Sequence, residues 1–212
     1  MTLRFRVKIC GITRPEDALV AARAGADAVG LVFVPQSPRC VDVEQARAVI
    51  GTLPPFVTPV ALFLDAEAEA VARVLAALPT AVPQFHGDES PEYCRSFGRP
   101  YLKAVPMGGG VDPQDYAHRF PDAAGLILDG HPAGEMGGSG RRFDWRTVPQ
   151  LGRPVILAGG LTPENVAEAV RIACPYGVDV SSGVESAPGI KDPARIEAFV
   201  AAVRALEMTE ET

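Results

Sequence analysis

Two side chains that can move protons stand at the ends of short apolar runs. Cys10 follows one such run near the start of the chain, and Asp129 ends the run Ala124-Gly125-Leu126-Ile127-Leu128. A carboxylate that closes an apolar strand is costly to bury unless it is paired or takes part in chemistry. A thiol has a reference pKa of about 8.5, nearer to neutral than that of a carboxyl, and becomes a base when it ionises. Taken alone, however, Cys10 is more typical of a buried, inert thiol, which is the commonest fate of a cysteine.

Other polar residues are candidates for supporting roles. His86 ends another apolar run, where it could pack in the core or assist chemistry. Arg39 lies in a loop, and its planar fork suits a carboxylate ligand, with a salt bridge as the plain alternative. By strand alternation Lys8 shares a face with Cys10, and Asp179 could be its structural partner if the last strand closes onto the first.

Glycine and serine residues follow two late apolar runs. Gly159 and Gly160 come after the first of these, and Ser182 and Gly183 come after the second. Such loops can present backbone N–H groups and a helix N-terminus to a phosphate. The alternative is that these glycines only form tight turns between a strand and a helix.

These candidates must be positioned by an alternation of strands and helices. The apolar pattern predicts eight strands, near 6–10, 27–33, 58–64, 82–86, 101–105, 124–129, 154–158 and 176–180. Several are apolar at nearly every position, as are strands buried on both faces of a parallel sheet. Between them the pattern predicts seven helices and a weak eighth at 144–149, with 66–77, 164–173 and 194–206 the clearest amphipathic stretches.

Helix starts are marked by side chains that can cap. Ser90, Asp112, Thr162 and Asp192 each precede a proline at the first helical position, and Thr13 opens a capping-box pattern. A βαβ unit near residue 10 also resembles one near residue 160. Eight strands with a repeated βαβ unit favour a single (β/α)8 barrel over an open doubly wound sheet.

In such a barrel the active site lies at the C-terminal ends of the strands, where Cys10, His86, Asp129 and the two glycine-containing loops stand. We expect one domain over residues 1–207 and a frayed tail at 208–212.

Composition narrows the classes of function. The 212 residues carry a net charge of −6, which disfavours nucleic-acid binding, and no apolar run is long enough to span a membrane. The N-terminus lacks a signal-peptide pattern, so we expect a cytoplasmic protein with four reduced cysteines. The cysteines are widely spaced, with no CxxC pair, and no metal site is predicted.

The motifs together resemble phosphoribosylanthranilate isomerase, a family of tryptophan biosynthesis. They occur in the family's order along nearly the whole chain, and only the ordered set is specific. They are Lys8-Ile9-Cys10-Gly11-Ile12-Thr13, Ser37-Pro38-Arg39, Gln84-Phe85-His86-Gly87, Leu128-Asp129, Gly137-Gly138-Ser139-Gly140 with Phe143-Asp144-Trp145, Leu157-Ala158-Gly159-Gly160-Leu161 with Asn165-Val166, and Val178-Asp179-Val180-Ser181-Ser182-Gly183-Val184-Glu185.

The resemblance implies an Amadori rearrangement without a cofactor or a metal. N-(5-phosphoribosyl)anthranilate would become 1-(2-carboxyphenylamino)-1-deoxyribulose 5-phosphate, with Asp129 as general acid and Cys10 as general base. Burial at the end of a dry strand is expected to raise the pKa of Asp129, as an acid at neutral pH requires.

The other site residues follow from the same resemblance. Arg39 would bind the anthranilate carboxylate, and Gly159, Gly160, Ser182 and Gly183 would hold the phosphate. Gly138 and Ser139 could add to the phosphate site, and Lys8, His86 and Asp179 would support the catalytic pair. The protein could act as a monomer or a homodimer.

Three alternatives compete with this interpretation. A related isomerase of histidine biosynthesis is expected to use two aspartates, so Cys10 argues against it. Indoleglycerol phosphate synthase would need additional catalytic Lys and Glu residues that the sequence does not place. A non-catalytic phosphate-binding barrel could have lost Cys10 or Asp129, and this chain keeps both.

Overall fold

The computed structural model describes residues 4–132 and 140–207. Eight parallel strands form one closed barrel in chain order, so the predicted (β/α)8 fold is confirmed. The strands are β1 (Arg6–Ile9), β2 (Ala28–Val32), β3 (Thr58–Phe63), β4 (Val82–Phe85), β5 (Leu102–Pro106), β6 (Gly125–Asp129), β7 (Val155–Leu157) and β8 (Gly177–Val180).

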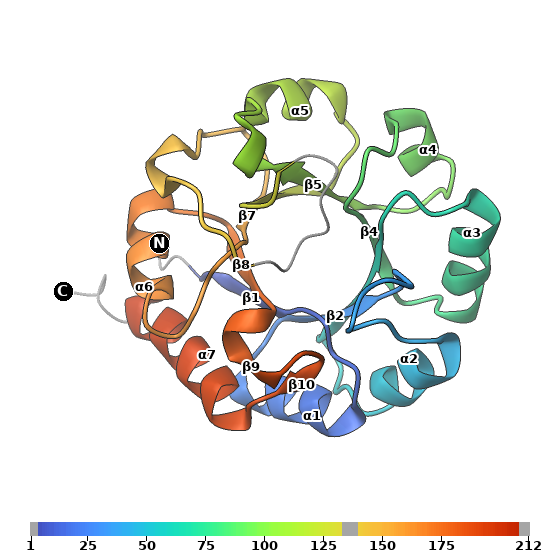
Figure 1. Cartoon of the computed structure of the whole chain (residues 1–212), viewed down its shortest axis with the longest axis horizontal. Coiled ribbons are helices and arrows are strands. Elements are labelled where there is room, and N and C mark those ends of the chain that lie inside the picture. The colour runs from blue at the N-terminus through green and yellow to red at the C-terminus, as the bar shows by residue number, and fades with distance from the viewer. Residues whose placement is uncertain (1–3, 133–139, 208–212) are drawn as a thin grey trace.

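Helices surround this barrel on the outside (Figure 1). They are α1 (Pro15–Ala24), α2 (Val43–Ile50), α3 (Ala68–Ala77), α4 (Pro91–Arg95), α5 (Pro113–Arg119), α6 (Val166–Ala173) and α7 (Pro193–Glu207). The weak helix predicted at 144–149 is a single 3₁₀ turn, η2 (Trp145–Thr147). No helix among residues 4–132 and 140–207 is long and apolar enough to cross a membrane.

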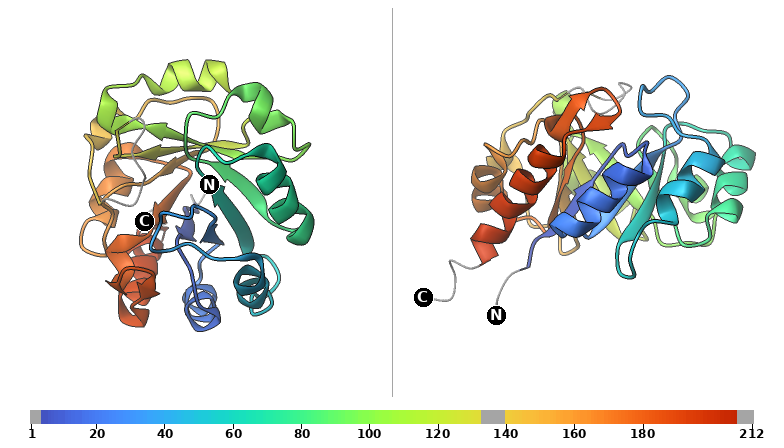
Figure 2. Two further views of the ribbon diagram at one scale, coloured as in Figure 1. Left: turned by 45° about the vertical axis from the view of Figure 1, so that its right-hand side comes forward. Right: turned by 90° about the horizontal axis from the view of Figure 1, so that it is seen from below.

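The barrel closes between the first and the last strand. β1 pairs with β2 on one side and with β8 on the other, and Lys8 lies opposite Asp179 in that register. Helices α1 and α7 pack side by side over this seam (Figure 2). The strands are buried on both faces, and in β6 all five residues are buried. Continuous apolar strands therefore form a parallel barrel here, as their composition predicted.

Three of the predicted helix caps are present. The side chains of Ser90, Asp112 and Asp192 accept hydrogen bonds from backbone N–H groups in the first turns of α4, α5 and α7. Each cap satisfies a donor that has no partner within the helix.

The predicted caps at Thr13 and Thr162 are wrong. The Thr13 hydroxyl donates to the carbonyl of Gly189, so it is used by a tertiary contact and not by α1. Thr162 lies in a turn, and α6 begins only after Asn165. Gly189 belongs to a small hairpin, β9 (Glu185–Ala187) with β10 (Ile190–Lys191), which the sequence pattern did not predict.

Candidate active site

One pocket opens at the C-terminal ends of the barrel strands. Its lining includes the predicted site residues Cys10, Arg39, His86, Asp129, Gly159, Gly160, Asp179, Ser182 and Gly183. Lys8 supports it from within the barrel, whereas Gly138 and Ser139 lie outside the described residues. The rule that barrel chemistry occurs at the C-terminal strand ends therefore selected residues that the fold brings to one pocket.

Cys10 directly follows β1, and its thiol is buried. Space for it comes from Gly30 of β2, because a Cβ atom at that position would stand 2.6 Å from the Cys10 Sγ atom. Burial raises the pKa of Cys10, and the positive charge of Lys8 offsets part of this rise. The Cys10 thiol therefore ionises less readily than a free cysteine, and the nearby lysine charge promotes its ionisation.

The predicted pair of Lys8 and Asp179 is present inside the barrel. Lys8 Nζ donates to Asp179 Oδ2 at 2.6 Å, and both side chains are almost fully buried. The pair holds the Lys8 charge near Cys10, so it is both a structural contact and an electrostatic influence on the thiol.

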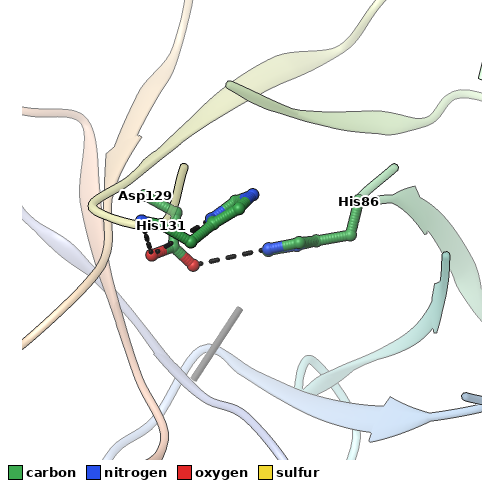
Figure 3. A group of neighbouring side chains, drawn as sticks. All are labelled: His86, Asp129 and His131. Carbon is green, nitrogen blue, oxygen red and sulfur yellow. Dashed lines mark hydrogen bonds and ion pairs between the residues drawn. The ribbon is translucent and has the colours of Figure 1, made fainter. Parts of the chain in front are cut away.

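Asp129 ends β6 beside two imidazole rings (Figure 3). His86 follows β4 and approaches from one side, with its Nε2 atom 3.4 Å from Asp129 Oδ2. His131 lies two residues beyond Asp129, with its Nδ1 atom 3.4 Å from Oδ1. The two rings stack with their centroids 4.6 Å apart. One carboxylate therefore faces two titratable rings in a buried position.

These imidazoles overturn the expected ionisation of Asp129. Burial does raise the pKa of its carboxyl, as predicted, but the nearby imidazoles of His131 and His86, each 3.4 Å from a carboxylate oxygen, outweigh burial and place the pKa well below its usual range. The prediction of a raised pKa was wrong because the partners of the carboxylate come from another strand and from the following loop. The lowered pKa favours the carboxylate form of Asp129 at neutral pH.

His131 was missed by the sequence analysis. Its side chain is 2% exposed, although it stands in the loop after β6. A signal was available, because a titratable residue just after a barrel strand lies at the functional face.

Arg39 lies at the pocket edge but already has a partner. Its Nε and Nη2 atoms each donate to the Glu185 carboxylate at 2.8 Å. Lys191 also donates to Glu185 at 2.8 Å, so one carboxylate joins two cations. The Arg39 Nη1 atom has no hydrogen bond to another described residue. The salt bridge that the sequence analysis gave as the alternative for Arg39 is therefore present. The Nη1 end of the guanidinium remains available for a contact with substrate.

The two glycine-containing loops pack tightly against each other. A Cβ atom at Gly183 would lie 1.9 Å from the Leu161 carbonyl oxygen, so only glycine allows this approach. Asn165 fixes the neighbouring loop, since its amide donates to the Gly160 carbonyl at 2.9 Å and its side-chain oxygen accepts from Thr162 N–H. Backbone from both loops therefore borders one hollow.

This hollow also has cationic side chains that the sequence analysis did not assign. Arg142 and Arg195 line it together with Ser182 and Gly183, and Glu164 contributes one carboxylate. Arg142 donates to the Gly160 carbonyl at 3.2 Å. Two guanidinium groups beside glycine backbone are suited to a phosphate.

Comparison with known proteins gives a family match over most of this chain. Residues 7–202 match the family described as N-(5'phosphoribosyl)anthranilate (PRA) isomerase. An N-(5'-phosphoribosyl)anthranilate isomerase of Neisseria meningitidis is 53% identical over 204 residues, which cover 96% of this chain and 98% of the relative.

Solved structures agree with the sequence comparison. The crystal structure of phosphoribosyl anthranilate isomerase from Thermus thermophilus superposes with a TM-score of 0.85 at 42% identity, covering 95% of this chain and all of that one. A second such isomerase was crystallised with reduced 1-(o-carboxyphenylamino)-1-deoxyribulose 5-phosphate; it gives a TM-score of 0.81 at 37% identity, covering 95% of this chain and all of that one.

Proposed function

This chain belongs to the N-(5'-phosphoribosyl)anthranilate isomerase family, and we propose that Cys10 and Asp129 carry out the proton transfers of its Amadori rearrangement. The enzyme is an isomerase of tryptophan biosynthesis that turns N-(5-phosphoribosyl)anthranilate into 1-(2-carboxyphenylamino)-1-deoxyribulose 5-phosphate. The assignment of residues depends on one observation: the Cys10 thiol and the Asp129 carboxyl line the same pocket, next to a hollow suited to an anion.

The reaction needs one acid and one base. Asp129 gives a proton to the ribose ring oxygen, which opens the ring to a Schiff base. Cys10 then takes the proton from C2, and the resulting enolamine tautomerises to the ketone. Both transfers require groups held within hydrogen-bond reach of the substrate.

Asp129 must carry a proton before it can give one. The free carboxyl is ionised, because His131 and His86 hold its pKa low. An anionic substrate in the same pocket raises the pKa of a neighbouring carboxyl, which favours the protonated form from which Asp129 delivers its proton.

Cys10 must lose a proton before it can accept one. Lys8 and Lys191 are the cations that stabilise its thiolate against the effect of burial. Both are anchored by carboxylates, Lys8 by Asp179 and Lys191 by Glu185. The positions of these charges are therefore fixed before the substrate binds.

The two anionic ends of the substrate are bound at separate places. The Arg39 Nη1 group contacts the anthranilate carboxylate, while Glu185 holds the other side of the fork. The phosphate lies against Gly159, Gly160, Ser182 and Gly183, with Arg142 and Arg195 nearby. Cytoplasmic action on this phosphosugar accords with the free thiols of all four cysteines.

Replacement of Cys10 tests the base. In Cys10→Ala, decay of the fluorescent substrate should slow by roughly a hundredfold or more, the usual scale for a general base. The matched control is Cys40→Ala, which removes a thiol outside the pocket and should keep normal turnover. Near-normal turnover of Cys10→Ala would reject the base assignment, and substrate binding without decay by the unaltered protein would indicate a non-catalytic barrel.

A further inference from the structure

The group formed by His86, Asp129 and His131 has a geometry that ordinary hydrogen bonding does not explain. Both contacts between an imidazole nitrogen and the carboxylate measure 3.4 Å (Figure 3). Charge-assisted hydrogen bonds of this type are usually about 2.7–2.9 Å long. The His86 Nε2 and His131 Nδ1 atoms are buried and form no regular hydrogen bond within the described residues.

The same distances fit a shared metal ion. Zinc binds histidine nitrogen and carboxylate oxygen at about 2.0–2.2 Å, so two ligand atoms on a tetrahedral ion stand about 3.4 Å apart. One ligand atom from each of the three residues lies within 4.8 Å of the others. The rings stack with their centroids 4.6 Å apart, so binding one ion requires them to turn until both nitrogens point at it.

The surroundings of His86 support a ligand role. Its other ring nitrogen, Nδ1, is 3.1 Å from the Gln84 amide nitrogen, while the Gln84 side-chain oxygen is buried without a partner. A half-turn of that amide lets its oxygen accept from Nδ1–H, which leaves the Nε2 lone pair directed at Asp129. Histidine ligands of metals are usually oriented by such an acceptor.

We propose that His86, Asp129 and His131 form a binding site for a divalent transition-metal ion, best suited to Zn²⁺, and that the bound ion inhibits the enzyme. Two imidazoles and one carboxylate suit zinc and its neighbours, whereas Mg²⁺ and Ca²⁺ prefer oxygen ligands. His86 and Asp129 line the pocket, so an ion can enter from there. The inhibition depends on the proposed role of Asp129, since a coordinated carboxylate cannot deliver a proton; the binding does not.

Binding is tested with Co²⁺, whose visible absorption reports tetrahedral coordination. The titration uses the full chain carrying Cys40→Ser and Cys174→Ser, which removes the two thiols that are not buried. The pH is kept at least one unit above the reference histidine pKa of about 6.5, so that protons do not compete. Added Zn²⁺ should displace the cobalt, and added Mg²⁺ should not.

Variants of two histidines then locate the site. His131→Ala should weaken cobalt binding by roughly a hundredfold, because even partners outside the ligand set contribute about ten- to a hundredfold. The matched control is His118→Ala, which removes an exposed histidine on α5 and should leave the affinity unchanged. Equal binding by His131→Ala and the parent, or no binding by the parent, would overturn the proposal.

Inhibition is measured separately from binding. Zn²⁺ should slow turnover of the parent, a chelator should restore it, and the potency should fall in His131→Ala relative to that variant's own activity. Suppose that the parent binds cobalt, that His131→Ala does not, and that Zn²⁺ leaves the turnover of the parent unchanged. This result would support the metal site and reject Asp129 as the acid. Inhibition of equal potency in both proteins would place the inhibitory ion elsewhere and overturn the proposal.

Discussion

The two ends of the barrel each hold a largely buried aspartate, and we propose that the two have different roles. Asp27 precedes β2 at the N-terminal end, and Asp129 ends β6 at the C-terminal end. Their side chains have similar exposed fractions, 15% and 10%. The pKa of each lies below its usual range although burial raises it. Burial alone therefore does not separate a structural carboxylate from a functional one.

The partners of the two carboxylates do differ. Asp27 Oδ1 accepts from Arg4 and Arg6, and Oδ2 accepts from Arg204 and from the Val7 backbone, at 2.8–3.0 Å. Arginine stays protonated at any working pH and matches the carboxylate geometry. Through these contacts Asp27 connects the start of β1 with helix α7, across the seam where the barrel closes.

Asp129 instead has 3.4 Å contacts to two imidazoles and accepts one backbone N–H, from His131, at 3.3 Å. A carboxylate with several short hydrogen bonds to arginines stabilises the fold, whereas one with longer contacts keeps lone pairs available to a substrate. The N-terminal end of this barrel thus serves stability and the C-terminal end serves chemistry.

Asp129→Asn should give the largest effect and leave the fold nearly unchanged. An amide cannot release a proton at a useful pH, so kcat should fall by roughly a hundredfold or more. The melting temperature should change by no more than about 2–4 °C, which corresponds to about 1 kcal/mol for a chain of this size. A destabilised but active variant would show that Asp129 is structural and would erase the contrast between the two ends.

Asp27→Ala should show the opposite pattern. Loss of several charge-assisted hydrogen bonds in a network partly open to solvent should lower the free energy of unfolding by about 2 kcal/mol. The melting temperature should then fall by about 4–8 °C, while kcat and KM stay within about twofold. Calorimetry and kinetics on the same preparation check this, and a strong loss of turnover by the folded variant would contradict it.

Arg39→Ala should have a smaller effect, confined to binding. Its proposed contact with the substrate carboxylate is the same in the ground and transition states, so KM should rise by roughly tenfold with kcat nearly constant. Lys191 remains to pair with Glu185, which should preserve the fold. The control is Arg47→Ala, an exposed arginine on α2, and steady-state kinetics should show no change for it. A fall in kcat with constant KM for Arg39→Ala would reject this role.

The smallest effect should be a pH dependence of the Asp27 contribution. The folded-state pKa of Asp27 is lowered, so its contribution is complete above the unfolded-state value of about 3.9 and is lost as the pH falls through the folded-state pKa. The difference in unfolding free energy between the parent and Asp27→Asn should therefore be largest near pH 7 and should shrink below about pH 4. Urea unfolding at several pH values measures it. A difference that grows toward low pH would contradict the direction of this pKa shift.

Much of the fold, and about half of the residues that line the pocket, could be predicted from local sequence. The strand limits agree with the apolar runs to within a residue or two, because strands buried on both faces must be apolar throughout. Cys10 and Asp129 were identifiable because each stands at the end of such a run, where barrel chemistry occurs. The Lys8–Asp179 pair also followed, once the barrel was assumed to close.

What sequence reasoning missed involves contacts between distant segments. The Thr13 hydroxyl was assigned to a local cap but binds Gly189, and the Arg39 fork was assigned to substrate but also holds Glu185. A local pattern can state which bonds a side chain is able to form. It cannot state which partner the fold brings within reach.

The sequence by itself therefore determined the order of elements, the closed parallel barrel they form and the two side chains for which we propose proton transfer, since each stands out from its neighbours in the chain. Only the tertiary structure decided the direction of the Asp129 pKa shift, which depends on His86, just after β4, as well as on His131. Electrostatic and hydrogen-bond energies fall off over a few ångströms in space and take no account of separation along the chain. For this reason the charge state of the site is a property of the folded barrel.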